Sequence, residues 1–285
     1  MNYGEEFLSL YNNLYAVIDY PQELADEVRN VAELWKKFCA LPLDVKRRCS
    51  FESQDEDWNS GYILRSQKDG YDNKEFYHIQ PNHAQLVEEA GLVATMRDYP
   101  VVKDFFDKSE RAVALLKEFV AQVSDDIARD NPHLKDLRDQ FLEGFEKNYS
   151  VLRFLHYTPD PDQYVIAEPH FDIGGMTFHV YESAPGLQFM KWDHSWEDAP
   201  LVEGKTLMFN AYGLEHMSDG VLQRTWHRVI QTAGSEGNER YSGVFFADFP
   251  NNSHWDTTKQ GRAKLQPQLY GPQKSLKSEK RKELK

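Results

Sequence analysis

Residues 168–189 read EPHFDIGGMTFHVYESAPGLQF, and this stretch combines a polar cluster with the alternation typical of a β-strand. His170 and Asp172 lie two residues apart. In a strand such positions point to the same face, with Phe171 pointing the other way. Two glycines and an alternating apolar run follow. Two ligand-type side chains on one face indicate either half of a metal site or a buried ion pair.

The size and composition of the chain are those of one elaborated globular domain. Its 285 residues are 40% hydrophobic and 13% aromatic, which is enough for a substantial core. No run approaches the roughly 18 apolar residues of a membrane span. The opening segment MNYGEEFLSL lacks the basic and apolar regions of a secretory signal. We therefore expect no membrane association.

The charge of the chain indicates what kind of partner it binds, and its cysteine content indicates its cellular compartment. The net charge of −13 would repel phosphate backbones, so we expect a small-molecule substrate and no nucleic acid. Cys39 and Cys49 are too few for a disulfide framework, which favours a cytoplasmic location. The basic C-terminal tail, KSLKSEKRKELK, is predicted to be a solvated terminal segment.

The period of the hydrophobic pattern changes along the chain. Apolar residues recur at steps of three and four over residues 21–42 and 101–128, which predicts two long helices. Residues 50–80 are predicted to be a loop with short extended pieces. The second half consists of short β-rich runs separated by Pro, Gly and acidic turns, typical of a sandwich or jelly roll. We predict a helical region, 1–147, packed on a β core, 148–285, as one folding unit.

A third metal ligand is available far downstream. His227 lies in the strand-like run TWHRVIQT. Two histidines and one carboxylate on one face of a metal leave three positions open, as in non-haem Fe(II) oxygenases. Zinc with a bound water would suit the same ligands. The same spacing recurs at His254 and Asp256, but in a polar stretch that we predict to be a surface loop.

A second polar pair opens the last strand-like run. Arg240 and Ser242 share a face by the strand period of two. An arginine inside a β core needs an anion, because an unpaired buried charge is costly. A guanidinium beside a hydroxyl can cradle the carboxylate of a ligand. The alternative is an internal salt bridge to one of the many acidic residues.

In order, these motifs resemble the isopenicillin N synthase-like family of Fe(II)- and 2-oxoglutarate-dependent dioxygenases. The segments that carry the resemblance are FCALPLDVKRR, YSVLRFLHYTP, PHFDIGGMTF, PGLQF, LMFN, MSDG, HRV at 227–229 and RYS at 240–242. The similarity runs from about residue 16 to residue 250. The ordered set is highly specific, although any one segment alone would be weak.

The resemblance implies a fold and a metal site. The fold would be mainly β, with a helical N-terminal part and a double-stranded β-helix (jelly-roll) core. Fe(II) would be held by His170, Asp172 and His227. The protein would then be an oxidoreductase of the dioxygenase type that uses Fe(II), 2-oxoglutarate and O₂. It would hydroxylate, desaturate or cyclise a small, partly apolar metabolite.

The resemblance also implies a cosubstrate site, with departures from the family pattern. Arg240 and Ser242 would hold the distal carboxylate of 2-oxoglutarate, with Tyr157 nearby. Leu155 stands where many members have Asn. This departure keeps open a 2-oxoglutarate-independent iron oxidase of the same family. A catalytically inactive jelly-roll binding module is the other alternative. His179 stands where Leu is usual, and its parity predicts that it lies off the metal face unless a bulge shifts the register.

Substrate-binding residues are predicted from strand parity and from the glycine-rich loop. Positions beyond the metal strand and beyond Arg240 would point inward, and the aromatic ones favour a partly apolar ligand. The predicted residues are Tyr62, Arg65, Met176, Phe178 and Phe246.

Overall fold

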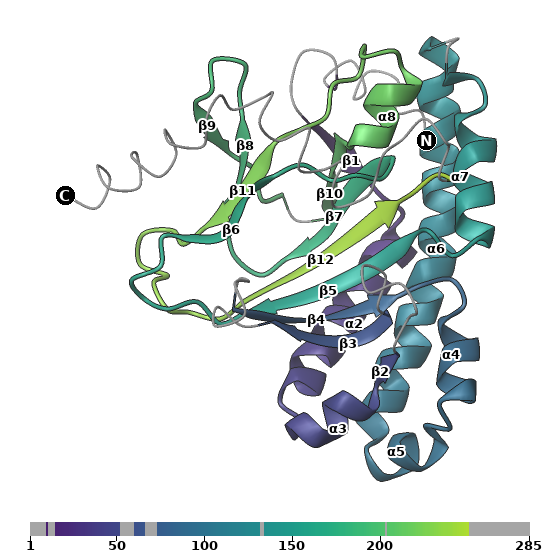
Figure 1. Cartoon of the computed structure of the whole chain (residues 1–285), viewed down its shortest axis with the longest axis vertical. Helices are drawn as coiled ribbons and strands as arrows, with labels where there is room; N and C mark the ends of the chain where they lie inside the picture. The colour runs from purple at the N-terminus through teal and green to yellow at the C-terminus, as the bar shows by residue number, and fades with distance from the viewer. Residues whose placement is uncertain are drawn as a thin grey trace. The chain divides into compact units, whose positions relative to one another are not determined.

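The computed structural model describes most of the chain (Figure 1). The described residues are 10, 15–51, 60–65, 73–131, 134–202 and 204–250. All of them belong to one compact unit, residues 1–250.

Two antiparallel sheets form the core. The large sheet has eight strands, in the order β1 (Ala16–Asp19), β10 (Lys205–Asn210), β7 (Met176–Glu182), β12 (Arg240–Ala247), β5 (Val151–Tyr157), β4 (Lys74–Ile79), β3 (Ser60–Arg65) and β2 (Ser50–Phe51). The small sheet has four, in the order β6 (Val165–His170), β11 (His227–Ile230), β8 (Leu187–Met190) and β9 (Trp196–Asp198). This is the jelly-roll core that the motifs predict.

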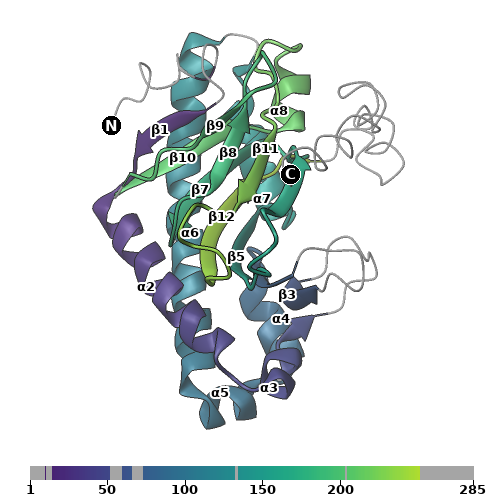
Figure 2. The same ribbon diagram turned by 90° about the vertical axis from the view of Figure 1, so that its left-hand side faces the viewer.

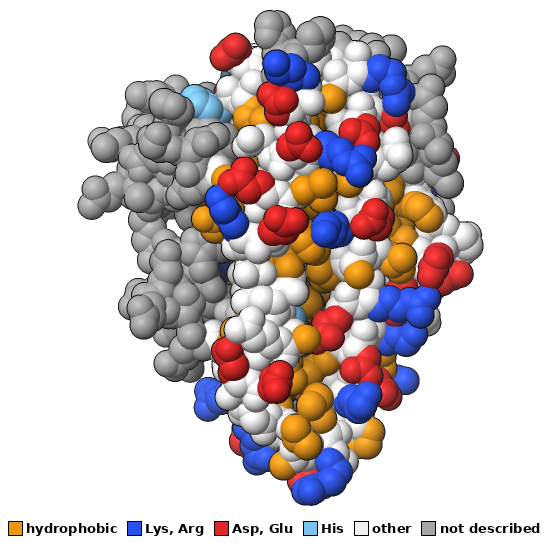
Figure 3. Space-filling model, turned by 90° about the vertical axis from the view of Figure 1, so that its right-hand side faces the viewer, with side chains coloured by type: hydrophobic (Ala, Val, Ile, Leu, Met, Phe, Trp, Pro, Cys, Tyr) orange, Lys and Arg blue, Asp and Glu red, His pale blue; other side chains and the backbone are white. Residues whose placement is uncertain are grey.

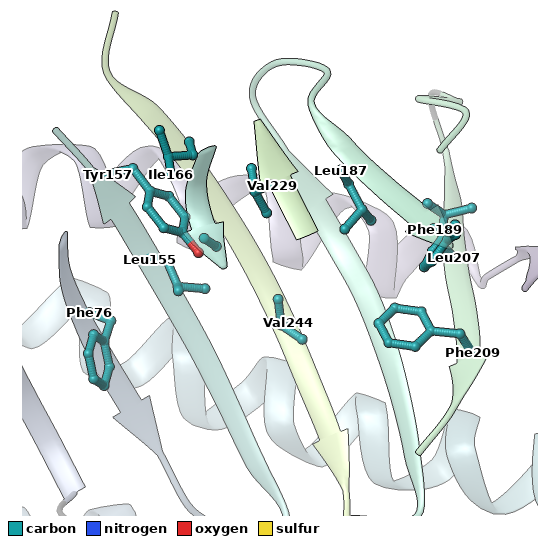
Figure 4. Packing of buried hydrophobic residues seen from close by; sticks show 11 residues of the cluster. Phe76, Leu155, Tyr157, Ile166, Leu187, Phe189, Leu207, Phe209, Val229 and Val244 are labelled. Atoms are coloured by element: carbon teal, nitrogen blue, oxygen red, sulfur yellow. The ribbon is translucent and has the colours of Figure 1, made fainter. Parts of the chain in front are cut away.

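Apolar side chains from both sheets fill the space between them. Leu155 and Val244 project from the large sheet, and Leu187 and Val229 project from the small one (Figure 4). Each is at most 5% exposed. Alternate residues of each strand therefore face this interior, as the strand period requires.

Helices cover the outer face of the large sheet. The two longest are α2 (Gln22–Cys39) and α6 (Pro100–Asp130), which lie along one side of the sheet in Figure 2. Trp35 of α2 packs against Phe105 of α6, with ring centroids 5.6 Å apart. The shorter helices are α3 (Leu43–Arg48), α4 (His83–Glu89), α5 (Val93–Asp98), α7 (Leu137–Glu146) and α8 (Tyr212–Met217). None of the helices in the described ranges combines the length and apolar character needed to cross a bilayer.

The helix-covered face carries charges of both signs in close alternation (Figure 3). Ion pairs join neighbouring turns of the helices, as Lys147 and Glu143 do at the end of α7, over 2.5 Å. Exposed pairs of this kind contribute little to stability. They keep the helices polar on the outside without giving this face a strong field of one sign.

The two predicted long helices are confirmed to within three residues at each end. Pro21 immediately precedes α2, and Pro100 occupies the first turn of α6, where a missing N–H costs nothing. The short extended pieces predicted within residues 50–80, SGYILR and KEFYHI, are confirmed as β3 and β4, but their place in the core sheet was not predicted. β3 and β4 form a hairpin there, and β4 pairs with β5, so they extend the core sheet.

An irregularity in β7 decides which side chains face the interior. Gly243 of β12 pairs with Tyr181, whereas the next residue, Val244, pairs with His179. Val180 is therefore an extra residue on β7, a β-bulge. As a result His179 and Glu182, three residues apart, both point to the inner face.

Candidate metal centre and adjoining cavity

Three side chains converge where β6 and β11 lie side by side. His170 ends β6, His227 begins β11, and the two are direct partners in the ladder. Their ring centroids are 4.2 Å apart. Asp172 follows β6 and lies close to both, with its Oδ1 4.0 Å from His170 Nε2 and its Oδ2 3.8 Å from His227 Nε2. The ligand atoms of all three lie within 4.8 Å of one another.

Backbone carbonyls orient both imidazoles. His170 Nδ1 lies 2.7 Å from the carbonyl oxygen of Glu168. His227 Nδ1 lies 3.2 Å from that of Thr225. A carbonyl oxygen only accepts, so each Nδ1 carries the proton and donates it. Both Nε2 lone pairs are left to face the carboxylate, the usual arrangement of metal-ligating histidines.

Electrostatics hold the cluster in the protonation states that a divalent metal requires. Burial acts to raise the pKa of Asp172, but His227 and His170 and a hydrogen bond outweigh it, so the pKa is lowered. That hydrogen bond is donated by Thr177 Oγ1 to Asp172 Oδ2, over 2.7 Å. Burial, together with the proximity of His170, lowers the pKa of His227 to about 3. One carboxylate and a neutral imidazole are what metal coordination needs.

The donor set fits the implied metal. Two imidazole nitrogens and one carboxylate oxygen suit Fe(II) with open positions, and also suit zinc. The described part of the chain holds one further group of this kind, formed by Cys39, Glu75 and His156. There, Glu75 already accepts from Lys46, at 2.5 Å, so an ammonium occupies the place of a cation. The His170 cluster is therefore the better metal site.

The cluster opens into a cavity inside the jelly roll. Its other lining residues are Lys74, Arg153, Leu155, Tyr157, Ala167, His179, Val229, Ser242, Val244 and Phe246. Both Tyr157 and Ser242, predicted as cosubstrate residues, lie on this lining. Most of the remaining surface is apolar, which would exclude water from a bound ligand.

Arg240 is not among the residues that line the cavity, but it lies beside Tyr157, which is among them. It is opposite Tyr157 in the ladder and only 4% exposed. Its Nη2 pairs with Glu182, while its Nε and Nη1 are buried without a hydrogen-bond partner. The internal salt bridge considered as an alternative is thus present. Two buried donors nevertheless remain for a ligand, and such donors are costly if left unpaired.

The prediction that His179 lies off the metal face is wrong. Its ring lines the same cavity as the metal cluster, and its Nδ1 lies 2.6 Å from Glu182 Oε1. Parity counted from Asp172 fails because residues 173–175 form a turn and not a strand.

The same error affects Met176 and Phe178, which do not line the cavity. Phe178 faces the opposite side of the sheet, where its ring centroid lies 5.8 Å from that of Phe119 on α6. Met176 lies two residues before Phe178 on the same face of β7 and is fully buried. Both are core residues between sheet and helices. Phe246, predicted on the same grounds, does line the cavity.

The two residues predicted from the glycine-rich loop also lie outside the cavity lining. The hydroxyl of Tyr62 donates to Glu75 Oε2 over 2.6 Å, on the helix side of the sheet. Arg65 is exposed, and its Cζ lies 5.1 Å from the Phe76 ring centroid. His254 and Asp256 fall outside the described residues.

Sequence reasoning missed two cations of the lining, Lys74 and Arg153. Arg153 has the same parity as Leu155 and Tyr157 in the run YSVLRFLHY, so the strand period alone could have identified it. Lys74 lies on β4, whose pairing with β5 could not be read from local pattern.

Comparison with known proteins agrees with this geometry. The model of the 2OG-Fe(II) oxygenase superfamily matches residues 148–248, which include all three members of the cluster. This segment of the chain therefore resembles the superfamily. Kihadalactone A synthase LFS of Citrus sinensis is 26% identical over 232 residues, which are 74% of this chain and 66% of that protein. A flavonol synthase/flavanone 3-hydroxylase of Arabidopsis thaliana is 25% identical, over 76% of this chain and 63% of its own. The chain thus spans just under two thirds of these relatives.

Several solved structures share this fold. A putative 2OG-Fe(II) oxygenase family protein from Caulobacter crescentus has a TM-score of 0.63 and 24% identity, covering 99% of this chain and 93% of that one. A full-length Neurospora crassa protein, crystallised in complex with alpha-KG, has a TM-score of 0.66 and 19% identity. The match covers 89% of this chain and 84% of that one. These likenesses establish the jelly-roll fold.

Proposed function

We propose that this chain is an Fe(II)- and 2-oxoglutarate-dependent oxygenase that acts on a small, partly apolar molecule. The observation that carries the proposal is the cluster of His170, Asp172 and His227, whose ligand atoms lie within 4.8 Å of one another. Both of its imidazoles are held by backbone carbonyls in the tautomer that ligates a metal. The match of residues 148–248 to the model of the 2OG-Fe(II) oxygenase superfamily supports the same assignment.

The residues of the chain have separate tasks in this proposal. The bound Fe(II), 2-oxoglutarate and O₂ would supply the oxidising chemistry. His170, Asp172 and His227 occupy one face of the metal and leave the other face to the cavity. Ser242 and the unpaired Nε and Nη1 of Arg240 receive the distal carboxylate of the 2-oxo acid.

The apolar lining has two tasks. Leu155, Val244 and Phe246 keep water from the reacting groups and offer a surface to the apolar part of the substrate. Hydroxylation, desaturation and cyclisation all begin with the same positioning of a substrate C–H bond, so any of the three suits this site. The N. crassa protein of the same fold was also crystallised with thymine, which supports a small organic substrate.

We also propose a cytoplasmic location. Cys39 and Cys49 are both free and buried. A chain that keeps its thiols reduced suits a reducing compartment.

An anaerobic titration tests the function directly. Adding Fe(II) and then 2-oxoglutarate to the protein should produce a visible metal-to-ligand charge-transfer band. Under air, 2-oxoglutarate-dependent release of succinate should follow. The band should be absent in His227→Ala and unchanged in His216→Ala, whose histidine is exposed on α8.

Other outcomes of these experiments would indicate a different function. O₂ consumption with no requirement for 2-oxoglutarate would indicate the oxidase of the same family. A folded wild type without the band, behaving like His227→Ala, would indicate a binding module.

A further inference from the structure

Arg153 is a cation of the cavity that forms no ion pair with an acidic group of the described residues. It lies on β5, lines the same cavity as the metal cluster and is only partly exposed. Its Nε donates to His78 Nε2 over 2.7 Å, so its hydrogen-bond partner there is a neutral ring nitrogen. No carboxylate of the described residues lies within ion-pair distance of it.

Two aromatic rings fix the position of this guanidinium. Its Cζ lies 5.2 Å from the ring centroid of Phe76 and 4.7 Å from that of Phe246. Arginine stacks on aromatic faces and keeps the donors at its edge available. The rings and His78 therefore hold Arg153 in place without neutralising its charge.

Burial without a counter-ion is unfavourable for this group. Desolvation lowers the pKa of Arg153 to about 10, and this effect exceeds the favourable field of Asp172. The guanidinium nevertheless stays charged at neutral pH. A partly buried charge that is positioned but unpaired is stabilised when a ligand brings the opposite charge.

The distal carboxylate of the cosubstrate cannot be that ligand. Arg240 is opposite Tyr157 in the ladder, whereas Arg153 is opposite Val244. The four residues from Arg153 to Tyr157 along β5 correspond to about 13 Å. A carboxylate held at the level of Arg240 therefore lies far from Arg153, so the anion that Arg153 binds is not the distal carboxylate of 2-oxoglutarate. A 2-oxoglutarate titration distinguishes the other carboxylate of the cosubstrate from a second molecule.

We propose that the primary substrate carries a carboxylate, and that Arg153 binds it. This inference rests on the proposed oxygenase function and adds the substrate class. Arg153 can form a bidentate, charge-assisted pair with a planar carboxylate. The neighbouring rings of Phe76 and Phe246 offer an apolar surface to the rest of the substrate, which suits an apolar or aromatic acid.

Calorimetry with matched probes tests the proposal on metal-free protein. The probes are 3-phenylpropanoate and hexanoate, each compared with its neutral amide. We expect the wild type to bind at least one acid at least tenfold more tightly than its amide. Arg153→Gln should abolish this preference, and Arg153→Lys, which keeps the charge and guards against a folding defect, should restore part of it. Arg65→Gln removes an exposed cation beside the same Phe76 ring and should change nothing.

A 2-oxoglutarate titration of the Fe(II) protein separates this proposal from the proposed function. Arg153→Gln should keep the affinity for 2-oxoglutarate within about twofold of the wild type. A tenfold loss would assign Arg153 to the cosubstrate and overturn the inference. Equal binding of acids and amides by the wild type would overturn it too. Absence of the charge-transfer band in the wild type would instead refute the oxygenase function, whatever the calorimetry gives.

Discussion

Replacing Asp248 by asparagine tests the electrostatics beside the metal centre. Asp248 follows β12, and its Oδ1 is buried without a hydrogen-bond partner. Burial, reinforced by the negative charge of Asp172, raises the pKa of Asp248 from 3.8 to about 7. Over the window between these values the folded state holds a proton that the unfolded state has released. Asp248 therefore destabilises the fold progressively as pH rises through that window.

The magnitude follows from the two pKa values. A rise of the pKa of Asp248 from 3.8 to about 7 destabilises the folded state by at most about 4 kcal/mol at high pH, where the carboxyl group is ionised in both states. Between pH 5 and pH 8.5, the stability of Asp248→Asn relative to wild type should therefore increase by about 3 kcal/mol. Asp248→Asn should show no such gain in stability at pH values well below the pKa of Asp248 in the unfolded state.

Urea denaturation at several pH values, with a chelator present, measures this difference. The chelator is needed because a divalent ion on Asp172 would cancel part of the field that raises the pKa. Asp104→Asn, which changes an exposed carboxylate of α6, is the matched control and should follow the wild type. A stability difference between Asp248→Asn and wild type that does not change with pH would refute the reasoning.

Three further substitutions test the packing. Phe178→Ala should lower the free energy of unfolding by about 3–5 kcal/mol, because the ring fills the core against α6. The affinity of Phe178→Ala for 2-oxoglutarate should equal that of the wild type. An unchanged free energy of unfolding with a weakened affinity would instead place the ring in the cavity. Gly174→Ala would put a Cβ 1.3 Å from Asp248 Oδ1. We expect a loss of more than about 1 kcal/mol in denaturation, partly recovered in the double variant with Asp248→Ala. In the wild type the ammonium group of Lys46 lies 2.5 Å from the buried carboxylate of Glu75. Lys46→Met removes this partner and should lower the free energy of unfolding by about 3 kcal/mol in the same assay.

Much of the site was predictable because it depends on neighbours in sequence. His170 and Asp172 lie close together as their spacing of two predicts, and Arg240 and Ser242 share the inner face for the same reason. The long helix ending at Cys39 was equally readable, since a stripe at steps of three and four needs no distant partner.

Predictions failed where strand register decides the outcome. Parity assigned Phe178 to the cavity and His179 away from it, and the structure has both reversed. The cause is a turn over residues 173–175, which breaks the count between Asp172 and β7. The bulge at Val180 then shifts the face again and turns Glu182 inward toward Arg240.

Local spacing in the sequence thus determined the elements, the ligand types and the pairs on one strand. Tertiary structure alone decided that His227 pairs with His170 across two strands and that no carboxylate of the described residues forms an ion pair with Arg153. The physical reason is that helical and strand periods are properties of consecutive residues. Register, bulges and charge pairing instead depend on contacts between segments far apart in the chain, and no local period records them.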